Sequence, residues 1–124
     1  MGYLLVFIGG GIGAALRHGV NRGAFALFGA SFPVATLFVN VAGSLAMGLL
    51  AELFLSKAGA NQELKLLLTT GLLGGFTTFS AFSLDAALMW QRGDQAGFAA
   101  YVIGSTALSI GAIFLGMVAV RAVA

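Results

Sequence analysis

Long apolar runs dominate the chain, and short segments between them hold most of its charged residues. A helix that crosses the hydrocarbon core of a bilayer needs about 20 predominantly apolar residues. Four runs contain no Asp, Glu, Lys or Arg: residues 1–16, 23–51, 66–84 and 96–120. The pattern predicts an all-α membrane protein, a single transmembrane domain over residues 1–124. We expect its four spanning helices at about residues 3–28, 33–55, 63–90 and 95–123.

The third run departs from a plain apolar helix over residues 71–83 (GLLGGFTTFSAFS), which combine three glycines, four hydroxyls and three phenylalanines. Two adjacent glycines followed by two β-branched threonines are poor helix formers. In lipid, a broken helix is tolerated only where the freed backbone is buried in protein or lines a watery cavity. We therefore predict a break near the middle of the third helix, at a functional site. The alternative is a flexible, glycine-rich packing helix.

Composition supports a membrane protein, because 60% of the residues are hydrophobic and only 8% are charged. Soluble domains carry about 25% charged residues. The formal net charge of +2 is too small to suggest a nucleic-acid partner. The apolar composition makes membrane lipid the expected surroundings. The chain has no cysteine, which excludes disulfides and thiolate metal sites.

The distribution of basic residues bears on orientation. With four spans, the two termini and the middle connection share one side of the membrane. Lys57, Lys65 and Arg121 lie on that side, and Arg17, Arg22 and Arg92 lie on the other. An excess of Lys and Arg normally marks the cytoplasmic side and sets orientation. Because the two sides are equal, we hypothesise that the chain inserts both ways (dual topology) and forms an antiparallel homodimer. The alternative is a weak bias that this count conceals.

The first two spans each hold a polar residue that needs a partner. Arg17 is costly in a membrane and must face a partner or water, or extend to the interface. Gly9 and Gly13 have the spacing of a close helix–helix contact. In the second span, Asn40 shares one helical face with Ser44. Its amide either makes an interhelical hydrogen bond or faces a pore and donates to an anion.

The fourth span carries a polar stripe, because Tyr101, Ser105 and Ser109 are spaced by four residues. The stripe predicts the lining of a pathway. The alternative is that each serine bonds the carbonyl four residues earlier in its own helix. Of the acidic residues, we expect Glu52 to be solvated and Asp85 to have a structural or vestibule role.

No catalytic constellation is visible, and we do not expect an enzyme. The side chains that remain are neutral donors and phenyl rings. The donors are Asn40, Thr77, Thr78, Ser80, Ser83, Tyr101, Ser105 and Ser109, and the rings are Phe76, Phe79 and Phe82. The edge of a phenyl ring is its positive rim. Neutral donors and ring edges suit an anion, whose hydration shell several groups must replace together.

Three motifs resemble those of the Fluc/CrcB family of bacterial fluoride channels. They are residues 10–17 (GGIGAALR), residues 40–44 (NVAGS) and residues 74–83 (GGFTTFSAFS). The resemblance covers the whole chain. It implies a fluoride-selective channel in the bacterial plasma (inner) membrane, through which cytoplasmic fluoride leaves passively. It further implies a dual-topology antiparallel homodimer with two pores.

The resemblance also implies roles for individual residues. Asn40, Phe79 and Phe82 face the anion, and Tyr101, Ser105 and Ser109 look like the family's polar track. Arg17 looks like the family's arginine near a vestibule. A structural sodium ion at the dimer centre takes the backbone carbonyls of Gly74 and Thr77. Two positions depart from the family pattern: Ala81 replaces a frequent Thr or Ser, and His18 replaces a frequent aromatic residue.

Two other functions are alternatives to a fluoride channel. A small proton-coupled multidrug or guanidinium exporter also has four spans, but it needs a membrane-embedded glutamate in the first span. Here no acidic residue precedes Glu52. A non-transporting accessory membrane protein would not need a polar track that leads to a broken helix.

Overall fold

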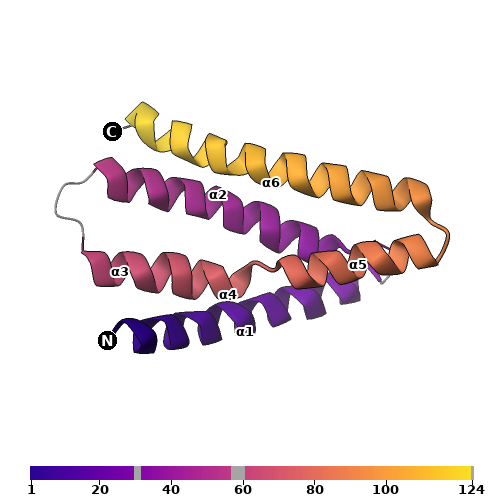
Figure 1. Cartoon of the computed structure of the whole chain (residues 1–124), viewed down its shortest axis with the longest axis horizontal. Coiled ribbons are helices and arrows are strands. Elements are labelled where there is room, and N and C mark those ends of the chain that lie inside the picture. Colours follow the sequence, from indigo (N-terminus) through magenta and orange to yellow (C-terminus); the bar gives the residue numbers. More distant parts are fainter. Residues whose placement is uncertain (30–31, 57–60, 124) are drawn as a thin grey trace.

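The computed structural model describes residues 1–29, 32–56 and 61–123. These residues form four helical segments that are long and apolar enough to cross a membrane, as the sequence predicts. They are α1 (Gly2–Phe28), α2 (Val34–Ser56), a third segment over Gln62–Gln91, and α6 (Gln95–Val123). Figure 1 shows the segments lying side by side, with both chain ends at the same end of the bundle. Lys57, which the sequence assigns to that end, lies outside the described residues.

The third segment is broken near its middle, as predicted. It consists of α3 (Gln62–Leu66), the π-helix η1 (Leu67–Leu73), α4 (Gly74–Phe76) and α5 (Phe79–Gln91). Thr77 and Thr78, between α4 and α5, are both extended, with ψ angles of 160° and 124°. The Thr78 hydroxyl accepts the N–H of Ala81 at 3.1 Å and caps α5. A Thr cap of this kind allows a helix to restart directly after an interruption.

Helix α1 packs against η1 and α4 through glycines. Gly9 and Gly13 are buried, and a Cβ on Gly13 would collide with the carbonyl oxygen of Leu72. On the other side of the contact, a Cβ on Gly75 would collide with the carbonyl oxygen of Gly10. The backbones therefore touch directly, which confirms the close contact predicted from the spacing of Gly9 and Gly13.

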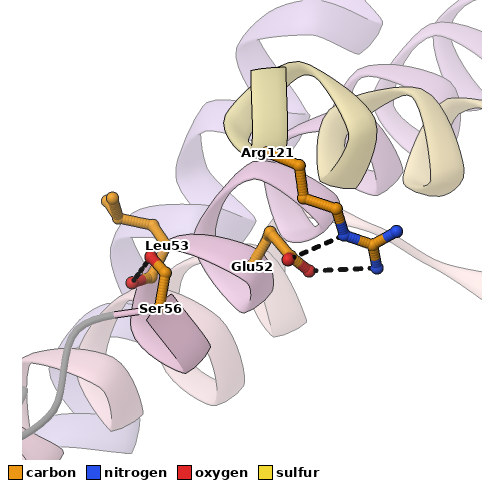
Figure 2. Close-up of polar contacts among 4 residues, drawn as sticks. All are labelled: Glu52, Leu53, Ser56 and Arg121. Carbon is orange, nitrogen blue, oxygen red and sulfur yellow. Dashed lines mark hydrogen bonds and ion pairs between the residues drawn. The ribbon is translucent and has the colours of Figure 1, made fainter. Parts of the chain in front are cut away.

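Helices α2 and α6 run in the same direction and form the other main helix pair (Figure 1). A Cβ on Gly48 would collide with the carbonyl of Ile113, and one on Gly116 with the carbonyl of Leu45. At the ends of the two helices, Arg121 holds Glu52 with two hydrogen bonds (Figure 2). The Nε–Oε1 distance is 2.8 Å and the Nη2–Oε2 distance is 3.3 Å.

This pair corrects one expectation from the sequence. Glu52 is not a solvated residue: its side chain is only 13% exposed and is paired with Arg121. A bidentate Arg–carboxylate pair is among the stronger polar contacts in proteins. It ties the ends of α2 and α6 together.

Candidate anion-binding groove

An open groove of about 400 Å³ lies between α2, the break and α6. From α2 it is lined by Asn40, Gly43, Ser44 and Met47; from the break and its flanks by Leu73, Gly74, Thr77, Thr78, Phe79 and Phe82; and from α6 by Ser105, Thr106, Ser109, Ile110 and Ile113. None of these lining residues is charged. The groove therefore offers hydroxyls, one amide, backbone carbonyls and phenyl rings in an otherwise apolar wall.

The structure brings most of the predicted site residues together at this groove. Asn40, Phe79, Phe82, Ser105, Ser109, Gly74 and Thr77 all line it. Ser80 and Ser83 are exposed on α5 and do not line it. The Ser80 hydroxyl pairs with that of Thr78 at 3.2 Å, and Ser83 donates to the Phe79 carbonyl at 2.9 Å.

Asn40 bridges α2 and the break through both ends of its amide. Its Oδ1 accepts the Thr78 N–H at 2.8 Å, and its Nδ2 donates to the Thr78 carbonyl at 3.0 Å. Asn40 therefore makes an interhelical hydrogen bond, one of the two roles that the sequence allows for it. Its amide satisfies both the backbone N–H and the backbone carbonyl of Thr78, an extended residue. An amide nitrogen carries two N–H donors, so one donor of Asn40 is not used by Thr78.

The break releases several carbonyls from their helical partners, among them those of Gly74 and Thr77. In a continuous helix the Thr78 N–H would bond the Gly74 carbonyl, and the Ala81 N–H would bond the Thr77 carbonyl. Here Asn40 takes the Thr78 N–H and the Thr78 hydroxyl takes the Ala81 N–H. The carbonyls of Gly74 and Thr77 are left to other donors or to a cation.

These carbonyls fit the chemistry of an alkali-metal site, since unwound backbone carbonyls coordinate sodium in membrane proteins. Among the described residues, no group of three or more His, Cys, Asp or Glu side chains could hold a metal ion. The two carbonyls are the oxygens that the sequence resemblance names for sodium, and the hydrogen bonds around the break explain why they are available.

Arg17 lies on the other side of the break, where α1 packs. Its Nε donates to the Gly75 carbonyl at 3.1 Å, and the contact is partly buried. In a continuous helix the Phe79 N–H would bond this carbonyl. Arg17 therefore supplies a donor that the break removes, and it is not among the residues that line the groove.

Aromatic rings continue from the groove into the core. The centroids of Phe79 and Phe82 are 5.5 Å apart, and those of Phe82 and Tyr101 are 5.0 Å apart. Tyr101 is 1% exposed, and its hydroxyl donates to Asp85 Oδ2 at 3.1 Å. Tyr101 thus packs behind Phe82 and does not itself line the groove, and Asp85 anchors it.

A second, smaller cavity of about 240 Å³ lies next to this anchor. Its polar lining residues are Asn21, Thr36, Asp85 and Arg92. Asp85 therefore contacts both Tyr101 and the cavity, which agrees with the structural or vestibule role expected for it.

Two hydroxyls that sequence reasoning did not assign also line the groove: Ser44 and Thr106. Ser44 shares the helical face of Asn40, so the signal was present in the sequence. Thr106 is adjacent to Ser105 and falls outside the four-residue spacing of the stripe. Only the position of α6 against the break identifies it.

Comparison with known proteins agrees with the resemblance seen in the sequence. The model of a family described as "CrcB-like protein, Camphor Resistance (CrcB)" matches residues 4–117. The chain is 53% identical over 123 residues to the fluoride-specific ion channel FluC of Rhodopseudomonas palustris (strain BisB5), covering 99% of both chains. It is 54% identical over 118 residues to FluC of Methylobacterium sp. (strain 4-46), covering 95% of this chain and 94% of the relative. These relatives are named as channels and not as enzymes.

Proposed function

Because this chain belongs to the CrcB family, we propose that it is a fluoride-selective channel. The observation that carries the proposal is the hydroxyl of Ser105 in the groove. It is 5% exposed and has no hydrogen-bond partner among the described residues. A buried donor without a partner is costly, and an anion in the groove would satisfy it. The serine therefore does not make the bond to its own helix that was the alternative for the stripe.

The lining suggests how the anion is accommodated. Moving a small ion from water into a medium of low dielectric constant costs on the order of 20 kcal/mol. The hydroxyls of Ser105 and Ser109, the unused N–H of Asn40 and the ring edges of Phe79 and Phe82 together replace water around fluoride. A side chain with a negative charge would repel the anion, and none lines the groove.

Transport is passive in this proposal. In the bacterial inner membrane, hydrogen fluoride enters as the neutral acid and ionises in the cytoplasm. The membrane potential, negative inside, then drives the anion out with a free energy of about 2.3 kcal/mol per elementary charge for each 100 mV.

We further propose that the working unit is an antiparallel homodimer with two pores. Phe79 is 78% exposed in the single chain although it lines the groove. A phenyl ring that helps to select an anion must be shielded from bulk water or lipid, and a second copy can supply that shield. The equal division of basic residues between the two sides supports the antiparallel arrangement.

A sodium ion at the centre of this dimer is the third part of the proposal. The released carbonyls of Gly74 and Thr77 would hold it. The cation would replace the N–H donors that these carbonyl oxygens lose at the break. Its role is structural, because it satisfies backbone groups that the break exposes.

Fluoride efflux from liposomes that contain only this protein tests the function. We expect rapid fluoride release that a fluoride electrode records, and little chloride release under the same conditions. An absence of fluoride release, or equal release of chloride, rejects the channel assignment.

The exporter alternative needs a membrane acid that is free to exchange protons, and neither Glu52 nor Asp85 is free among the described residues. Glu52 is paired with Arg121 at the end of α2, and Asp85 accepts the hydroxyl of Tyr101. A proton-driven exporter would release guanidinium when a pH gradient is imposed on the same liposomes, and we expect no such release.

A further inference from the structure

Two classes of hydroxyl group in the membrane spans differ in whether the donor is already used. Thr69, Thr77 and Ser83 each donate to the carbonyl four residues earlier, at 2.7 Å, 2.9 Å and 2.9 Å. This is the usual behaviour of Ser and Thr within a helix. Such a hydroxyl has used its donor and has little to offer a ligand.

The second class makes no such bond. In the part of the chain that the structure describes, no hydrogen bond involves the hydroxyl of Ser44, Thr106 or Ser109, and that of Ser105 is buried and unpaired. All four line the groove. Thr70 also has no hydrogen-bond partner among the described residues, but it is exposed on η1 and does not line the groove. Unused donors thus gather where the anion is proposed to pass.

The four hydroxyls differ in depth. Ser105 is buried, Ser44 and Ser109 are half-buried, and Thr106 is exposed. Ser44 belongs to α2 and the other three belong to α6, so donors face the groove from two helices. Fluoride is a small anion that accepts strong hydrogen bonds, and several donors must act together to replace its hydration shell.

We propose that Ser44 and Thr106 are two further residues that contact the transported anion and determine its selection. Thr106 meets the ion at the exposed edge of the groove, and Ser44 donates to it from the α2 wall. The inference rests on the proposed fluoride pathway and adds to it one donor on α2, beside Asn40, and one on α6, beside Ser105 and Ser109.

The test compares variants that keep the hydroxyl with variants that remove it. Thr106→Val keeps the shape of the side chain and removes the donor, while Thr106→Ser keeps the donor. Ser44→Ala and Ser44→Thr make the same comparison on α2. Thr70→Val is the matched control, because it removes an unpaired hydroxyl that lies outside the groove.

The measurement is the initial rate of fluoride release from liposomes over a range of fluoride concentrations, with chloride release in parallel. We expect Thr106→Val and Ser44→Ala to lower the fluoride rate by about five-fold each, the factor for one ordinary hydrogen bond. The fluoride-to-chloride ratio should fall with it. Thr106→Ser, Ser44→Thr and Thr70→Val should stay near the wild-type rate.

The outcomes separate this inference from the proposed function. If the wild-type chain conducts fluoride while Thr106→Val and Ser44→Ala behave like Thr70→Val, the two added contacts are wrong and the channel assignment stands. If the wild-type chain does not conduct, the channel assignment itself fails. Thr106 is exposed, so its variants are expected to fold. If Ser44→Ala does not yield folded protein, the Thr106 variants alone test whether added hydroxyls contact the anion.

Discussion

Asn40 joins two tasks in one side chain. It bonds both backbone groups of Thr78, and its remaining N–H is available to the groove. Asn40→Asp keeps the acceptor for the Thr78 N–H but loses the donors and adds a negative charge. Two like charges a few ångströms apart repel by several kcal/mol at the effective dielectric constant of a protein. We therefore expect fluoride release to fall more than tenfold in liposomes.

A control variant, Asn40→Ala, separates the effect of the added charge from the loss of hydrogen bonds to Thr78. Asn40→Ala removes both bonds to Thr78, of which Asn40→Asp keeps one, and it should lower the unfolding temperature, but it adds no charge. Conduction by Asn40→Asp at the wild-type rate would remove Asn40 from the anion pathway.

Phe79 contributes little to the packing of the single chain. Its ring is 78% exposed and contacts Phe82 at the edge of the groove. Phe79→Ile keeps an apolar side chain and removes the positive ring edge, so we expect fluoride release to fall about tenfold. The dimer should persist in size-exclusion chromatography.

Phe82→Ile should have the same effect on release and a larger effect on stability, because the Phe82 ring also packs on Tyr101. If both variants release fluoride normally, the rings have no part in selection.

Among the helices, the α1 contact with the third segment sets how close Arg17 comes to the break. Gly13→Ala places a methyl group against the Leu72 carbonyl. Overpacking of this kind costs about 2 kcal/mol, and we expect a lower unfolding temperature in detergent.

Gly23→Ala is the matched control on the same helix, because nothing lies within 4 Å of a Cβ there. Alanine favours a helix over glycine by about 1 kcal/mol, so this variant should be at least as stable as the wild type. Equal unfolding temperatures for the two variants would contradict the close contact at Gly13.

The elements also explain which features were predictable from the sequence. The four spans and the break depend on local composition, namely apolar length and the glycines and threonines of residues 74–78. The π-helix η1 and the Glu52–Arg121 pair depend on how distant helices align, and no local pattern reports that alignment. For Asn40, the sequence allows two roles, an interhelical hydrogen bond and a donor that faces a pore. One amide can fill both roles, and only the position of Thr78 in the structure shows the hydrogen bond.

For the whole molecule, the proposed sodium ion links the break to assembly. Its ligands are backbone carbonyls, so no side-chain substitution removes them, and withdrawal of sodium is the direct test. A ligand present at 100 times its dissociation constant stabilises the folded state by about 2.7 kcal/mol. We expect the unfolding temperature and the dimer fraction to fall when N-methylglucamine replaces sodium at equal ionic strength. Identical values in both salts would argue against the ion.

The proposed dual topology rests on the equal division of basic residues between the two sides, and that balance can be shifted deliberately. In cells, a reporter fused to the C-terminus should be detected on both sides of the membrane in similar amounts. Lysines added after residue 124 should hold that end in the cytoplasm, and lysines added at the Gly93–Asp94 turn should hold the opposite end there. Each biased variant alone lacks antiparallel partners, so we expect weak fluoride release from its vesicles.

Co-expression of the two biased variants should restore release, because each supplies the orientation that the other lacks. A reporter found on one side only in the unmodified chain, or full release from a single biased variant, would contradict the antiparallel dimer. Neither result would affect the groove within one chain, whose donors and rings all come from α2, the break with α5, and α6.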